Sequence, residues 1–183
     1  MVPRLFPILL ALAVLLLSGC IVGNDRFAVA NELASLREQY VPLGLIAPPT
    51  EQGRQDYRVN LIKLRSKVSG VGEGKSTLLA YFDASLESIT MQEEINGAFS
   101  LLQRVKAETL NCNAGTPADL AMQQLRSAQT RSESVHASFL LVQKDIALTN
   151  ALGAEYVTNA ASTTENISIS VTNTLEQIRQ NCV

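Results

Sequence analysis

Residues 117–142 have the sequence PADLAMQQLRSAQTRSESVHASFLLV, which carries the most regular apolar pattern in the chain. Apolar and small side chains recur alternately four and three positions apart, and this spacing places them along one side of an α-helix. The seven-residue period predicts left-handed packing against neighbouring helices. We expect one helix from Pro117 to about Leu152. Its buried row would comprise Ala121, Leu125, Ala128, Ser132, Val135, Phe139, Val142 and Ile146.

The start of this helix is marked by Thr116-Pro117-Ala118-Asp119. Threonine is a common N-cap residue, proline suits the first helical turn, and an acid there faces the positive end of the helix dipole. The preceding residues 113–116, which include Gly115, predict a turn.

A second long helical pattern covers residues 76–111 and contains two apolar rows. The rows are out of phase, and residues 90–93 (Thr-Met-Gln-Glu) have the spacing of a capping box, in which a helix begins. The segment is therefore either one helix whose buried face swings round or two helices end to end. The first row is Leu79, Phe82, Leu86 and Ile89, and the second is Met91, Ile95, Ala98, Leu102 and Val105.

The N-terminal part of the domain predicts two shorter helices, over residues 25–40 and about 51–68. Three prolines in residues 41–50 remove backbone donors, so this segment is expected to be a loop. Thr50 would cap the second helix. The first helix has the apolar side Phe27, Ala30, Leu33, Ala34, Leu36 and Tyr40, and the second has Tyr57, Leu61, Leu64 and Val68. The second helix would also present a basic outer face of Arg54, Arg58, Lys63, Arg65 and Lys67.

The last helix is expected to open at the capping box of residues 162–165 and to end near Gln180. Gly153 would break the preceding helix, unless that helix continues through Tyr156. Residues 167–172 alternate like a strand, but no partner strand is visible, so a helix is favoured. Its buried face would be Ile167, Val171, Leu175 and Ile178.

Together these patterns predict an all-α fold, an antiparallel bundle of four to six helices with long central helices, over residues 25–183. The net charge is −2 and no basic stripe is present, which argues against a nucleic-acid partner. The chain has no tryptophan and few other aromatics, so an aromatic-lined pocket for a carbohydrate or cofactor is not indicated, and no cofactor is expected.

The first twenty residues contain a charged start with Arg4, an apolar run over 5–17 and the sequence Leu17-Ser18-Gly19-Cys20. This segment resembles the lipobox of membrane lipoprotein precursors. The resemblance implies cleavage before Cys20 and a diacylglyceryl group on its thiol, so that residues 1–19 are a signal peptide and 20–24 a tether. An uncleaved anchor is the alternative, although the run of about thirteen residues is short for a spanning helix.

Both alternatives place the rest of the chain outside the cytoplasm, with Cys20 as the link to the membrane in the first. Ile21 follows Cys20 where aspartate would retain a lipoprotein in the inner membrane. In a bacterium with two membranes, we therefore expect an outer-membrane anchor facing the periplasm.

The remaining cysteines are Cys112 and Cys182. Outside the cytoplasm, a remaining pair favours a disulfide over two separate buried thiols. The expected chain path supports this pairing. The helix that ends before Cys112 and the last helix, which ends at Cys182, finish at the same end of an antiparallel bundle.

Residues 69–77 contain Gly74-Lys75-Ser76 and resemble a phosphate-binding loop. That motif needs a glycine where this chain has Ser69, and it needs a preceding strand where this chain predicts a helix. We expect a glycine turn that binds no nucleotide.

Acidic and histidine side chains offer few other candidates for chemistry. Glu133 and His136 have the Glu-x-x-His spacing of di-iron bundles, but such sites need a second histidine and this chain has one. The acid pairs Asp83 with Glu87 and Glu93 with Glu94 are expected on solvated helix faces rather than in acid–base catalysis. We therefore expect no metal and no enzyme activity.

Asn166-Ile167-Ser168 is a sequon, and it matters only where exported proteins are glycosylated.

These observations predict a lipid-anchored module with a non-catalytic binding or scaffolding role in the cell envelope, with a protein of the envelope as its partner. The alternative is a bundle that senses a small ligand or signal. A large apolar cavity between helices would favour sensing, and a long exposed apolar stripe would favour a protein partner.

Overall fold

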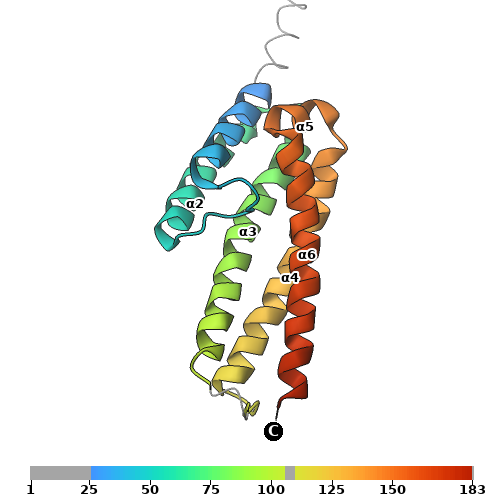
Figure 1. The fold of residues 1–183 in the computed structure, drawn as a ribbon. Helices are drawn as coiled ribbons and strands as arrows, with labels where there is room; N and C mark the ends of the chain where they lie inside the picture. The colour runs from blue at the N-terminus through green and yellow to red at the C-terminus, as the bar shows by residue number, and fades with distance from the viewer. Residues whose placement is uncertain (1–25, 106–109, 183) are drawn as a thin grey trace, which may run out of the picture.

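The computed structural model describes residues 26–105 and 110–182. The expectations for Cys20, the signal peptide and the tether lie outside these residues. The described chain is all-α, as predicted, and consists of an N-terminal helical segment over 26–40 and six further helical elements (Figure 1). These elements are α2 (Glu51–Arg65), the 3₁₀ turn η1 (Ser66–Gly70), α3 (Lys75–Leu102), α4 (Pro117–Gln143), α5 (Ile146–Leu152) and α6 (Ala154–Gln180).

Three long helices form the body of the molecule. Helix α4 packs along both α3 and α6, and neighbouring helices run in opposite directions (Figure 1). The segment 26–40 and α2 cover one half of α3, so that half is packed on two sides. None of the described helices is both long enough and apolar enough to cross a bilayer.

Helix α3 is one continuous helix, which settles the alternative left open for residues 76–111. The Thr90 hydroxyl donates to the Leu86 carbonyl within the helix, so the capping-box sequence opens no new helix. The helix ends at Leu102 rather than near 111, and residues 106–109 lie outside the described part. Members of both apolar rows, such as Phe82 and Met91, are buried. The two rows exist because the first half of α3 packs against α2 and the 26–40 segment as well as the long helices.

The predicted row on α4 is confirmed from Ala121 to Val142, where every member is at most 1% exposed. The prediction was wrong beyond that point: α4 ends at Gln143, and Ile146 is 74% exposed. The cause is Asp145, whose side chain accepts a hydrogen bond from the Leu148 N–H at 3.1 Å and so starts the short helix α5.

The start of the last helix was also misplaced. Helix α6 begins at Ala154 and includes residues 162–165 in its interior. There the Thr164 hydroxyl donates to the carbonyls of Ala160 and Ala161, a bond that competes with a capping role. Residues 167–172 are helical, as favoured from the sequence.

The N-terminal helices follow the prediction with one correction, which concerns Arg54. Thr50 caps α2 by accepting from the Gly53 N–H, and the α2–η1 apolar face is buried. Arg54, expected on the outer basic face, is only 6% exposed, because its guanidinium donates to the carbonyls of Pro48 and Pro49. η1 ends at Gly70, and Gly74 has a left-handed backbone with φ +77° just before α3.

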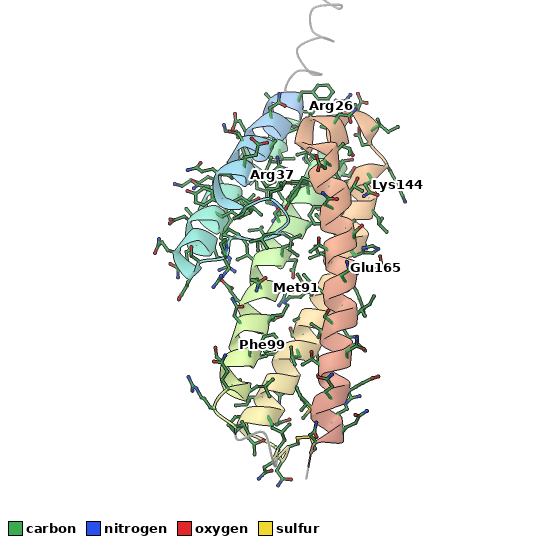
Figure 2. All side chains as sticks on the ribbon, viewed as in Figure 1. Arg26, Arg37, Met91, Phe99, Lys144 and Glu165 are labelled. Atoms are coloured by element: carbon green, nitrogen blue, oxygen red, sulfur yellow. A yellow bond between two sulfur atoms is a disulfide. The ribbon has the colours of Figure 1, made fainter. Side chains whose placement is uncertain are left out.

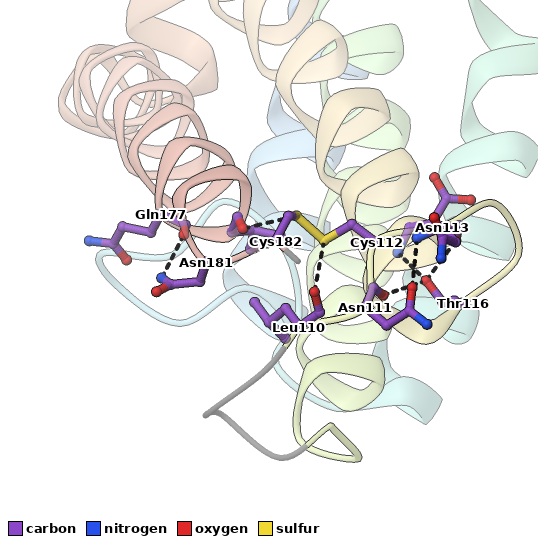
Figure 3. Close-up of a disulfide and its surroundings, with 10 residues drawn as sticks. Leu110, Asn111, Cys112, Asn113, Thr116, Gln177, Asn181 and Cys182 are labelled. Carbon is purple, nitrogen blue, oxygen red and sulfur yellow. Dashed lines mark hydrogen bonds between the residues drawn. A yellow bond between two sulfur atoms is a disulfide. The ribbon is translucent and has the colours of Figure 1, made fainter.

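The far end of the bundle holds the two cysteines (Figure 3). Cys112 and Cys182 lie at disulfide distance, with 1.95 Å between sulfurs and 5.5 Å between α-carbons. Leu110 also forms an isolated parallel bridge with Cys182. The adjacent turn leads into Thr116, which caps α4 by accepting from the Asp119 N–H. The end of α6 is thus fastened to the connection between α3 and α4.

Candidate functional site

A buried arginine lies on the inner side of the 26–40 segment. Arg37 is 8% exposed, although only apolar residues were expected on this side. It follows Leu33 by four positions and Ala30 by seven, and this spacing places it on their face of the helix. That spacing is the signal that could have identified it. Figure 2 labels Arg37 on the side of the segment that faces α6.

The Arg37 guanidinium is stacked but poorly hydrogen-bonded. Its carbon lies 4.4 Å from the centroid of the Tyr156 ring, a cation–π contact. Nη2 donates to Oε1 of Glu38 at 2.8 Å, and the Glu38 side chain is 71% exposed. Nε is buried and has no hydrogen-bond partner within the described residues. A buried guanidinium whose one acidic partner among the described residues is an exposed side chain is suited to an additional acidic partner.

Gly153 brings the start of α6 against Arg37. Its backbone has φ +93°, a conformation that favours glycine. A β-carbon at this position would lie 3.2 Å from Nη1 of Arg37, so the close approach also depends on the missing side chain.

The N-terminus of α6 has no side-chain cap. Val157 is the first residue of the helix whose N–H donates back to Gly153. The N–H groups of residues 154–156 therefore have no acceptor within the helix, and the helix dipole places partial positive charge there. Such a terminus attracts anions.

These groups line an open pocket of about 390 Å³, here called the Arg37 pocket. Its size falls in the range of small-molecule sites. The pocket combines one buried cation, one aromatic face, two acids and a short apolar loop. Its lining residues are Arg37, Glu38, Val41, Pro42, Leu43, Gly153, Glu155 and Tyr156.

The floor beneath Tyr156 is aromatic. The Tyr156 ring packs edge-to-face on Phe139, with centroids 6.2 Å apart, and lies 6.5 Å from the ring of Tyr81.

Burial raises the pKa of Tyr57 to about 12, against the opposing effects of a Ser85 hydrogen bond and the Arg37 charge. Burial likewise raises the pKa of Tyr81 and that of Tyr156. The three phenols are therefore neutral at physiological pH, and among the described residues the carboxylate that pairs with Arg37 is that of Glu38.

Among the described residues, Cys112 and Cys182 are brought together as predicted, but the other residues singled out from the sequence do not assemble into this or another site. Lys75 is the exposed first residue of α3, and the chain before the glycine turn is helical rather than a strand. His136 Nδ1 lies 2.9 Å from the carbonyl oxygen of Ala161, and Glu133 is exposed. The described residues contain no group of three or more potential metal ligands. Asn166 is exposed in the middle of α6 rather than in a loop.

The acid pairs on α3 are ion-paired between helices, which corrects the expectation of simple solvated faces. Glu87 and Glu94 both bind Arg131 of α4, the second at 3.0 Å, and the hydrogen bonds that Arg131 donates to these carboxylates raise its pKa. Glu93 binds Arg58 of α2 at 2.8 Å, and Asp83 binds Arg65 at 2.8 Å. These contacts link α3 to its neighbours.

Comparisons of the chain with protein-family models, with curated proteins and with solved structures find no match. The geometry of the chain itself therefore carries the functional proposal.

Proposed function

We propose that this chain is a lipid-anchored, extracytoplasmic helical bundle that binds a small ligand with an acidic group in the Arg37 pocket, without catalysing a reaction on it. The observation that carries the proposal is the Arg37 guanidinium, which is 8% exposed, has the exposed Glu38 as its one acidic partner among the described residues and lies at the start of α6, where no side chain caps the helix. Carboxylate and phosphate groups are the usual partners of such a cation and such a helix terminus.

The surface gives less support to a scaffolding role. Large exposed apolar side chains are spread over the loop 41–50 and each of α2 to α6, rather than aligned along one helix. They are Leu43, Leu45, Val59, Ile62, Phe99, Leu120, Leu140, Leu141, Ile146 and Ile169. A protein partner in the envelope stays a prediction from the sequence, while the pocket favours a small ligand.

The anchor part of the proposal rests on the lipobox-like residues 17–20. Lipidation at Cys20 holds the bundle at a membrane, and Ile21 favours the outer membrane when the source has two membranes. The first described residue, Arg26, belongs to the same end of the bundle as α5, which would then be the membrane-proximal end (Figure 2).

Calorimetric titration of the detergent-solubilised, full-length lipoprotein with a panel of small carboxylates and phosphates tests the binding proposal. Arg37→Gln is expected to weaken the best acid by about tenfold or more, because a hydrogen bond to a charged group contributes roughly 1.5–3 kcal/mol. Arg126→Gln, at an exposed position of α4, is the matched control and should bind as the unmodified protein does. Equal affinity in Arg37→Gln with an unchanged melting temperature contradicts the proposal, as does the absence of binding by every acid.

A further inference from the structure

The Arg37 pocket carries acids as well as a cation. Glu38 lies at its rim with Oε1 2.8 Å from Nη2 of Arg37, and Glu155 lies in the first turn of α6. Both residues are exposed, so both carboxylates are open to solvent and to a ligand.

A ligand with negative charge alone fits this arrangement poorly. Its acid would gain from Arg37 and the α6 N–H groups, but it would also lie close to Glu38 and Glu155, and like charges at short range oppose binding. A ligand that carries an ammonium group beside its acid removes this conflict, since the ammonium satisfies the two carboxylates.

The hydrogen bonding of Arg37 leaves room for such a ligand. Glu38 engages only Nη2, and among the described residues Nη1 makes no hydrogen bond. An arginine binds a carboxylate best through two parallel N–H bonds. A ligand acid that pairs with the guanidinium would release Glu38 to the neighbouring ammonium, which keeps every charge paired.

The remaining walls indicate the side chain of the ligand. Val41, Pro42 and Leu43 form the apolar part of the pocket lining, and Leu43 is 92% exposed and without described packing of its own. An aliphatic group placed against these residues would bury apolar surface on both partners.

We propose that the Arg37 pocket recognises a zwitterion of the α-amino acid type with an aliphatic side chain, its acid held by Arg37 and the α6 N-terminus and its ammonium by Glu38 and Glu155. This proposal rests on the proposed function, because it names the ligand class of the same pocket.

The test uses three matched probes with the detergent-solubilised, full-length lipoprotein. Leucine carries both charged groups, isocaproate lacks the ammonium, and isoamylamine lacks the carboxylate. We expect leucine to bind at least about tenfold more tightly than either analogue, because each analogue leaves charged groups of the pocket without a partner.

Variants separate the two halves of the site. Glu38→Gln combined with Glu155→Gln should bring leucine and isocaproate close to equal affinity, whereas Arg37→Gln should weaken both. Glu165→Gln, at an exposed position further along α6, is the control and should leave the preference for leucine unchanged.

The outcomes distinguish this inference from the proposed function. If isocaproate binds as tightly as leucine, the zwitterion is excluded while an acid-binding pocket stands. If isoamylamine binds best, both the zwitterion and the role of Arg37 fail. If none of the probes and no acid of the wider panel binds, the proposed function itself is overturned.

Discussion

The Arg37 guanidinium carbon lies 4.4 Å from the centroid of the Tyr156 ring, and this contact joins the 26–40 segment to the first turn of α6. Tyr156→Leu is expected to lower the free energy of unfolding by about 2 kcal/mol, because it removes the cation–π contact and the edge-to-face packing on Phe139. Tyr156→Phe keeps the ring and should stay close to the unmodified protein. Urea unfolding of the two variants measures the difference, and equal losses would show that the ring face contributes nothing.

A side chain at position 153 is expected to destabilise the folded chain. Gly153→Ala should lower the free energy of unfolding by about 1–3 kcal/mol, since it strains a backbone at φ +93° and places a β-carbon 3.2 Å from Nη1 of Arg37. Gly115 has a similar φ of +81° and open space around it, so Gly115→Ala measures the cost of backbone strain alone. Gly70→Ala has neither constraint and should be nearly neutral. A Gly153→Ala variant no less stable than Gly115→Ala would remove the argument for close approach.

Reduction of the Cys112–Cys182 pair is expected to destabilise the bundle. The two residues are separated by 70 positions, and the chain-entropy account gives about 4 kcal/mol for a loop of that length. Urea unfolding with and without reductant, together with the Cys112→Ser and Cys182→Ser double variant, measures this contribution. Two titratable thiols in the denatured, unreduced protein would show that the bond is absent.

The predictable and the unpredictable parts of the fold have different physical origins. The α4 row from Ala121 to Val142 follows from a periodicity that tertiary packing only reinforces. The start of α6 was missed because Gly153 offers no side-chain cap, whereas the capping sequence at residues 162–165 lies inside a helix. Local sequence alone does not show which of the potential N-cap residues begins a helix in the folded chain.

The Arg37 pocket could not be predicted from the sequence as a whole site. Its cation lies at position 37, and its glycine and helix start lie at 153–156, so only the packing of the 26–40 segment on α6 joins them. Arg37 itself was detectable, because it shares the face of Ala30 and Leu33. The prediction placed charged residues on the surface, and for this reason it was wrong for Arg54 as well, which is buried.

Near neutral pH, the free energy of unfolding is expected not to depend on the ionisation of the buried tyrosines. Under alkaline conditions, their ionisation is expected to lower it. Burial raises the pKa of Tyr57 from 10.0 to about 12 in the folded chain. Below pH 10 both folded and unfolded states keep the phenol protonated. Above pH 10 the unfolded state loses its proton first, so folding loses up to about 1.4 kcal/mol per pH unit for such a group. Tyr57→Phe should reduce this slope in urea unfolding between pH 9 and 12, and an unchanged slope would contradict the assignment.

Cys20 is expected to carry the lipid. Cys20→Ser should leave the chain without a diacylglyceryl group and no longer retained in the membrane fraction, because no other residue supplies the lipobox thiol. Intact mass of the membrane-extracted protein measures this directly, with Cys112→Ser as a control that should still be lipidated. An unmodified chain that starts at Met1 would contradict the anchor and leave the pocket untouched.

The most direct measurement of the central claim is the amide spectrum of the ¹⁵N-labelled protein in detergent during titration with isocaproate and, separately, with leucine. Binding at the Arg37 pocket predicts the largest shift changes at the N–H groups of Ala154, Glu155 and Tyr156, and their loss in Arg37→Gln. The alternative groove beside Glu32 is lined by Asn60, Lys63 and Lys67. Shift changes confined to that groove, or unaltered by Arg37→Gln, would contradict the account.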